Sequence, residues 1–233
     1  MKRPILFICS ILFINGCLLA QKNEPVIVKA GTRVTDYFPI ADRYLYADFT
    51  PGKAIFSNDR IYPSVFNYNF LSGEMEFIKS KDTLIITDKS DLLSIVVAQD
   101  TFYYYNGYLQ MIRSGQLKVW LKQSIAMMDT RKKGAMGTVN RSAASESYDF
   151  WLTRSVSIDL VADIDMVLRK AEVYFFSTPG EDFVRFSKKN IIKIVPGKED
   201  DVKNYIKLNE IDFDSREDLL RLADFVSKLL SEK

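Results

Sequence analysis

The chain has 233 residues, of which 47% are hydrophobic and 13% aromatic, a composition that indicates a packed core and excludes a disordered protein. Its 32 basic and 30 acidic side chains nearly cancel, which argues against a nucleic-acid-binding protein. It contains no histidine, and this excludes the commonest general base, the commonest zinc ligand and any serine–histidine or cysteine–histidine dyad.

The first residues have the pattern of an export signal. A basic start at residues 1–3 precedes an apolar run at residues 4–14, and cleavage would follow Ala20. A lipoprotein signal is the alternative, in which Cys17 carries the lipid. A retained signal anchor also stays open, because the apolar run approaches the length of a membrane-spanning helix. All these interpretations predict an exported protein that is periplasmic, outer-membrane-associated or extracellular.

Removal of a signal at residues 1–20 would change two properties of the chain. It takes away two of the 32 basic residues, Lys2 and Arg3, and none of the 30 acidic ones, so the remaining chain would have no net charge. Cys9 and Cys17 both lie in this segment. A chain cut after Ala20 would therefore have neither a disulfide nor a thiol nucleophile.

Residues 21–128 have the pattern of an antiparallel meander, because short β-branched and aromatic runs alternate with Gly, Asn, Asp and Ser. The strongest hairpin signal is the Asn-Gly pair at residues 106–107. Glu74 and Glu76 alternate with apolar residues, so we expect them on a solvated strand face. Residues 92–98 are apolar on both faces, which predicts cover on both sides of that strand.

Residues 129–149 interrupt the strand pattern. They combine a basic run with a Ser/Ala-rich stretch, and this composition predicts a flexible loop. Residues 150–186 then predict further strands of the same domain, at residues 155–160, 166–168 and 172–176.

Residues 187–233 have a helical pattern and are expected to pack on the sheet. Ser187 and Ser215 each stand where a helix would begin, with side chains suited to cap it. The predicted fold class is therefore α+β, mainly antiparallel, with a sandwich or a partly closed barrel and two or three C-terminal helices.

Several stretches share a pattern with other proteins, in the closing segment, in the middle of the meander and at the end of the signal: residues 183–194, 205–207, 218–222, 67–71, 73–78, 82–84 and 19–21. They resemble a group of uncharacterised secreted proteins of Bacteroidota, and the similarity covers most of the chain after the signal. The resemblance implies a location and a fold. It implies no activity and no site residues.

Candidate catalytic residues are few. The sequence has no Gly-x-Ser-x-Gly elbow, no Ser-x-x-Lys and no phosphate-binding loop, so no cofactor is predicted. Asp159, Asp163 and Asp165 have the same parity on a predicted strand and would face one side. Three such carboxylates could bind Ca²⁺ or provide an acid/base pair, whereas the alternative is the polar face of an amphipathic strand.

A cluster of aromatic residues is the second candidate site. Tyr103, Tyr105 and Tyr108 flank the predicted hairpin, and Trp120 lies on the next strand. These rings could stack on a sugar or line an apolar pocket. The alternative is cross-strand packing within the sheet.

The sequence favours an exported, non-enzymatic binding or interaction module. Its predicted partner is an envelope protein or an amphipathic ligand, and a cavity between strands that carries a lipid is the second hypothesis. A carboxylate-based or Ca²⁺-dependent enzyme acting on glycans is the third. Contact with a membrane is expected only through an N-terminal lipid or an uncleaved signal.

Overall fold

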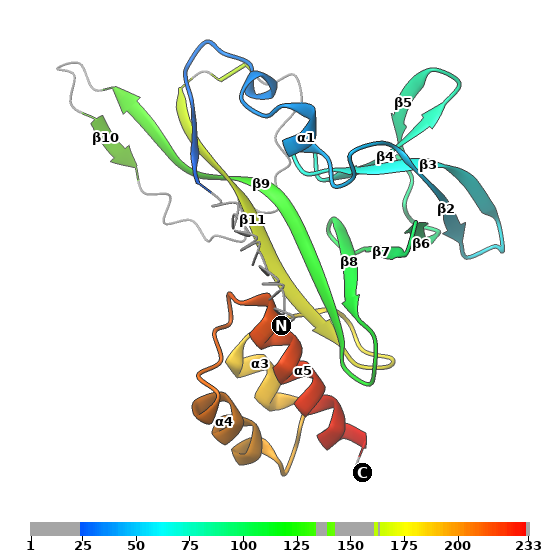
Figure 1. The fold of residues 1–233 in the computed structure, drawn as a ribbon, viewed down its shortest axis with the longest axis vertical. Coiled ribbons are helices and arrows are strands. Elements are labelled where there is room, and N and C mark those ends of the chain that lie inside the picture. Colours follow the sequence, from blue (N-terminus) through cyan, green and yellow to red (C-terminus); the bar gives the residue numbers. More distant parts are fainter. Residues whose placement is uncertain (1–23, 134–138, 143–160, 163, 232–233) are drawn as a thin grey trace, which may run out of the picture.

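The computed structural model describes residues 24–133, 139–142, 161–162 and 164–231 (Figure 1). The strands in these residues are β1 (Val26–Val28), β2 (Thr50–Phe56), β3 (Ile61–Asn69), β4 (Glu74–Lys79), β5 (Asp82–Ile85), β6 (Leu92–Val97), β7 (Asp100–Tyr104), β8 (Tyr108–Arg113), β9 (Lys118–Lys133), β10 (Val139–Ser142), β11 (Asp165–Ser177) and β12 (Val184–Arg185). They form one sheet in the order β1-β11-β9-β8-β7-β6-β2-β3-β4-β5, with β10 paired to β9 and β12 to β11. Neighbouring strands are antiparallel throughout these pairs.

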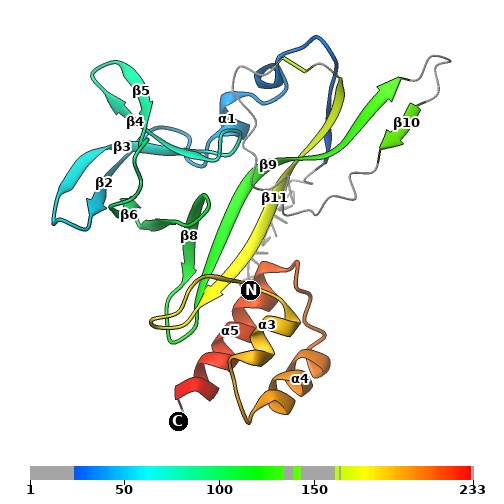
Figure 2. The ribbon, with the colours of Figure 1, turned by 180° about the vertical axis from the view of Figure 1, so that it is seen from behind.

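The two longest strands, β9 and β11, pair with each other and connect the smaller strands to the C-terminal helices (Figures 1 and 2). We call this pair the long hairpin, although β10 lies between the two strands in the chain. These strands have 16 and 13 residues and pair along the whole of β11, with one irregularity between Val167 and Leu168. The smaller strands β2–β8 lie to one side of this hairpin, and the C-terminal helices lie at one end of it (Figure 1).

The sheet curls so that the end of β3 returns to β9. The backbone N–H of Ile125 donates to the Phe70 carbonyl at 2.8 Å, and the Tyr68 hydroxyl donates to the Gln123 carbonyl at 2.7 Å. The Tyr68 ring packs inside this curl against Phe102 and Tyr108, with ring centroids 6.2 and 6.3 Å away. These contacts form the first hydrophobic core, on the concave face of the sheet.

The helices of the described residues are the 3-10 turn η1 (Val34–Asp36), α1 (Ile40–Arg43), α3 (Lys188–Lys193), α4 (Glu199–Leu208) and α5 (Arg216–Ser231). The last three form a second core with the end of the long hairpin, where Ile191 and Leu222 join Val119 and Phe176. The predicted fold class, mainly antiparallel α+β with C-terminal helices, is confirmed.

Local signals at turns and caps were accurate. The hairpin predicted at residues 106–107 joins β7 to β8, and Asn106 and Gly107 have φ angles of 49° and 116°, which a tight hairpin turn requires. The Ser187 hydroxyl accepts from the Asn190 N–H at 3.3 Å. The Ser215 hydroxyl accepts from the Asp218 N–H at 3.4 Å. Both cap predictions are therefore confirmed.

Residues 92–98, expected to be covered on both faces, are buried or half-buried except at Leu93 and Ala98. Ile95 and Val97 are fully buried in the first core, and Ser94, which faces the other side of the sheet, is 7% exposed. Leu93 is 50% exposed and lies where the register between β2 and β6 shifts. Large apolar side chains are common on protein surfaces, and this limits what a two-faced apolar run predicts.

The described part of the loop predicted at residues 129–149 is strand. Strand β9 continues to Lys133, and β10 pairs back onto it from Val139 to Ser142. Similarly, β11 is one strand where two had been predicted, at residues 166–168 and 172–176. Backbone pairing with a neighbouring strand satisfies the amide groups whatever the side chains are, so composition alone was misleading here. The strand predicted at residues 155–160 lies outside the described residues.

Glu76 was expected to face solvent, and this was also wrong, because only 4% of its surface is exposed. The segment before β2 pairs with the end of β3, where the Leu45 N–H donates to the Tyr68 carbonyl at 3.0 Å and Tyr44 forms an antiparallel bridge with Asn69. The Tyr44 hydroxyl donates to Glu76 Oε2 at 2.6 Å, and Asn69 Nδ2 donates to Oε1 at 2.9 Å. Nearby, the Tyr46 hydroxyl donates to Asp100 at 2.6 Å. The carboxylates thus hold the aromatic segment on the sheet.

Candidate functional site

An apolar groove at the end of the sheet is the best candidate for a binding site. It has a volume of about 600 Å³ and is formed by β2, β3, β4, β5 and the segment after β5. Its walls are mostly aromatic and aliphatic: Ala54, Phe56, Tyr62, Phe66, Phe77 and Leu84. Sites for small molecules typically have volumes of ~300–1,000 Å³ and walls of this kind, with a few polar groups.

The groove is the uncovered end of the first core. Alternate side chains of β3 face the concave side of the sheet, because side chains alternate along a strand. Their exposure falls along the strand, from 52% at Tyr62 to 2% at Phe66 and 3% at Tyr68. Strand β5 ends the sheet, and its Leu84 remains 40% exposed. The same face that packs the protein interior therefore continues into solvent.

Gly52 sets how closely β2 approaches the floor of the groove. A Cβ atom at this position would lie 2.4 Å from the Val96 carbonyl oxygen and 3.1 Å from the Phe66 ring. Only glycine permits this approach without a shift of the backbone. The position of Phe66 thus depends on the absence of a side chain on β2.

The polar groups of the groove lie at its rim. Lys79 and Ser80, at the end of β4, and Ser64 on β3 contribute to the lining. The Ser64 hydroxyl donates to the Ile78 carbonyl at 2.9 Å and so has no proton left for a ligand. Among the described residues that line the groove, none is acidic and Lys79 is the one cation. Lys79 therefore provides the one charge among the described lining residues.

A second cleft, of about 780 Å³, lies between β11, β12 and the loop before α5. Charged residues of both signs line it, including Arg169, Glu172 and Asp214. Glu172 accepts from the Tyr174 hydroxyl at 2.6 Å and from Gln123 Nε2 at 2.9 Å. Burial, and then this bond to Glu172, raise the pKa of Tyr174. These polar groups satisfy one another and hold the end of the hairpin together.

The predicted aromatic site is split by the sheet. Tyr108 is 1% exposed and lies in the first core beside Tyr68. Trp120 is 2% exposed and packs edge-on against Tyr103 at 4.9 Å, while its indole N–H donates to Ser177 at 2.9 Å. Tyr105 contacts Phe183 at 5.0 Å, close to Trp120. The four residues therefore do not form one ligand surface, and cross-strand packing accounts for their positions.

The three predicted carboxylates cannot be compared as a group, because Asp159 and Asp163 lie outside the described residues, as does Cys17. Asp165, at the start of β11, accepts from Lys29 Nζ at 2.9 Å and from the Ala30 N–H at 3.0 Å. These bonds tie the end of β1 to β11. Within the described part of the chain, no three His, Cys, Asp or Glu side chains gather as a metal site.

The sequence analysis did not single out the groove residues. The signal that points to them is the run at residues 84–86, which is apolar on both faces although charged residues flank it at residues 81–82 and 88–89. Such a run on a short strand indicates either a buried strand or an uncovered apolar edge. The strand order decides between these possibilities, and it cannot be derived from the run itself.

Comparisons with protein-family models, with curated proteins and with solved structures find no match to this chain. The resemblance to secreted proteins of Bacteroidota stays a prediction. No helix among the described residues is both long enough and apolar enough to span a membrane. The geometry of the groove is therefore the main basis for a functional proposal.

Proposed function

We propose that this protein is an exported, non-enzymatic binding module of the cell envelope, and that its groove takes up the apolar part of an amphipathic ligand. The observation that carries this proposal is the continuity between the first core and the groove. Phe66 and Phe77 pack with the core residues and also line the groove. An aliphatic chain placed there would meet the surface that the protein otherwise buries within itself.

The size of the driving force supports an aliphatic ligand. Transfer of a methylene group from water to an apolar site contributes ~0.8 kcal/mol. The groove is walled by strands, and its volume of about 600 Å³ can hold a chain of several methylene groups. Its open side leaves the polar end of such a ligand in water, next to the rim, so the ligand need not lose the hydration of its head group.

The proposal of a non-enzymatic role is supported by the use of the buried carboxylate. Each carboxylate oxygen of Glu76 accepts a hydrogen bond, one from Tyr44 and one from Asn69, and Glu76 does not line the groove. A carboxylate that acts as a general acid or base needs a free position facing its substrate. Glu76 instead stabilises the fold by joining Tyr44 to β3 and β4.

The location belongs to the same proposal and is supported by the pattern of residues 1–20. The intact mass of the protein from its own cells tests it. We expect the mass of a chain that begins at Gln21, or of a chain that carries a lipid on Cys17. A full-length cytoplasmic chain would contradict export and leave the proposal for the groove in place.

Two adjacent residues of β5 offer a matched test of the groove. Leu84 lines it and is 40% exposed, whereas Ile85 is 43% exposed and does not line it. We expect native mass spectrometry of the protein from its own cells to detect a co-purifying amphiphile. Leu84→Glu should lose it, because a carboxylate would then occupy the apolar wall. Ile85→Glu should keep it. Equal occupancy in the two variants would contradict the proposal.

A further inference from the structure

We propose that the ligand of the groove is a long-chain carboxylate: one aliphatic chain with an anionic head group, which Lys79 binds. This inference rests on the proposed function and adds the charge and the class of the ligand. It starts from the asymmetry of the groove, in which apolar walls end at a rim with one cation and, among the described lining residues, no anion.

Lys79 is available for a ligand. It is the last residue of β4 and is exposed, and it forms no ion pair with any described residue. Asp82 stands opposite Lys79 in the β4–β5 ladder, yet the two side chains are not bonded, and Asp82 does not line the groove. The ammonium group therefore has all its donors free for an anion at the rim.

Ser64, another polar residue at the rim, does not provide a donor for an anionic ligand. Its hydroxyl group donates to the Ile78 carbonyl, so it can only accept a hydrogen bond from a ligand. The charge of Lys79 would repel a cationic head group, and a neutral head group would gain no ion pair from it. Charge complementarity thus selects an anionic head group.

The apolar wall begins directly beside the cation. Ile78 precedes Lys79 in the chain and lines the groove, and Phe77 pairs across the ladder with Leu84, another lining residue. A carboxylate held at the ammonium group would place the first methylene groups of its chain against these side chains. Head-group contact and chain burial can therefore occur together in one extended ligand.

Binding of three twelve-carbon probes tests the inference: dodecanoate, dodecanol and dodecyltrimethylammonium, each below its micelle concentration, on the chain as the cell produces it. Isothermal titration calorimetry should give the tightest binding for dodecanoate. Decanoate should bind more weakly than dodecanoate by up to about fifteenfold, since each buried methylene contributes about fourfold. Lys79→Gln should weaken dodecanoate by about fivefold, the upper end for an exposed ion pair, and leave dodecanol unchanged.

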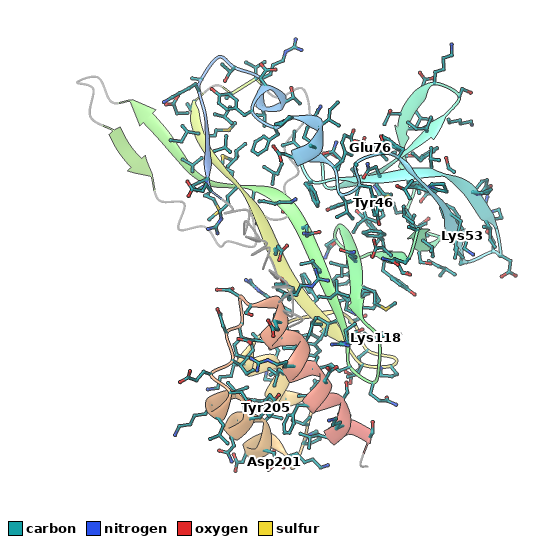
Figure 3. All side chains as sticks on the ribbon, viewed as in Figure 1. Tyr46, Lys53, Glu76, Lys118, Asp201 and Tyr205 are labelled. Carbon is teal, nitrogen blue, oxygen red and sulfur yellow. The ribbon has the colours of Figure 1, made fainter. Side chains whose placement is uncertain are left out.

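Lys53 provides the control for charge. It lies on β2 beside Ala54, which lines the groove, and the alternation of the strand turns Lys53 to the other face (Figure 3). Lys53→Gln removes the same charge from the same end of the sheet, and it should leave the affinity for dodecanoate unchanged. An equal loss in both lysine variants would mean that only the net charge matters, and it would overturn the assignment of Lys79.

The remaining outcomes separate this inference from the proposed function. If dodecanol binds as tightly as dodecanoate and Leu84→Glu abolishes both, the groove binds apolar chains and the inference about charge is wrong. If no probe distinguishes Leu84→Glu from the unsubstituted protein, both proposals are wrong. If the protein binds phosphatidylglycerol vesicles and no monomeric probe, the ligand is a membrane surface and the inference is again overturned.

Discussion

Replacement of Tyr44 by Phe removes one hydrogen bond to a buried carboxylate and leaves the ring in place. The Tyr44 hydroxyl donates to Glu76 at 2.6 Å, and Glu76 is 4% exposed. A hydrogen bond to a charged group contributes ~1.5–3 kcal/mol, and an unsatisfied buried acceptor bears the cost of its desolvation. We expect Tyr44→Phe to lower the free energy of unfolding by about 2 kcal/mol, which for a chain of this size corresponds to a Tm lower by ~4–8 °C.

The effect of this substitution should depend on pH. Burial, followed by the hydrogen bond to Glu76, raises the pKa of Tyr44 from 10.0 to about 12. Because the folded-state pKa is the higher one, the contribution of the neutral phenol is fully present below pH ~10. It is lost as the pH rises from the unfolded-state pKa through the folded-state value. The stability difference between Tyr44→Phe and the unsubstituted protein should therefore shrink between pH 10 and pH 12.

Urea unfolding followed by tryptophan fluorescence, at pH 7 and at pH 11, measures both effects. Tyr62→Phe is the matched control, because Tyr62 is 52% exposed and none of the described hydrogen bonds involves its hydroxyl. It should change the free energy of unfolding by less than ~0.5 kcal/mol. If Tyr44→Phe is as mild as Tyr62→Phe, or if its cost at pH 11 equals that at pH 7, the hydrogen bond to Glu76 does not hold the segment.

Two further substitutions test packing and capping. Gly52→Ala should destabilise the fold by ~1–3 kcal/mol in urea unfolding, because its Cβ would lie 2.4 Å from the Val96 carbonyl oxygen, and an unchanged midpoint would contradict this tight approach. Ser187→Ala should cost ~1 kcal/mol, because its hydroxyl caps α3 by accepting from Asn190, and Ser187→Asp should restore most of the loss. A thermal melt in which Ser187→Asp behaves like Ser187→Ala would argue against the cap.

Local features of the fold were predictable because their causes are local. The turn at residues 106–107 needs two positive φ angles, and Asn-Gly is the pair that provides them at least cost. Ser187 and Ser215 cap helices through bonds to residues three positions later, a distance that sequence inspection covers. Each prediction required only neighbouring residues.

The errors share the opposite property. Whether Glu76 faces water depends on Tyr44, which lies 32 residues earlier in the chain and donates a hydrogen bond to it. The exposure of Leu93 depends on the register shift between β2 and β6, which involves a strand far from it in the chain. Alternation along a strand assigns residues to two faces. It does not say which face another segment covers.

The aromatic candidates do not lie together as one group, for a related reason. Tyr105 and Tyr108 are close in sequence, but the hairpin turn between them allows their side chains to lie on opposite faces of the sheet. Tyr108 joins the first core, whereas Tyr105 packs near Phe183 on the other face. Proximity in sequence therefore predicted a cluster that the strand geometry divides.

The groove, at the uncovered end of the first core, lies beside β5, the last strand of the sheet. An open edge strand is a risk for a folded protein, because its free backbone groups can pair with another chain. Strand β5 is short and is bounded by Lys81 and Asp82 at one end and by Asp88 just beyond the other, and such charges discourage pairing. The backbone edge is thus protected, while Leu84 and Tyr62 on the groove face stay apolar and exposed. A backbone edge that is protected, beside an apolar face that stays open, is the arrangement that the proposed ligand site requires.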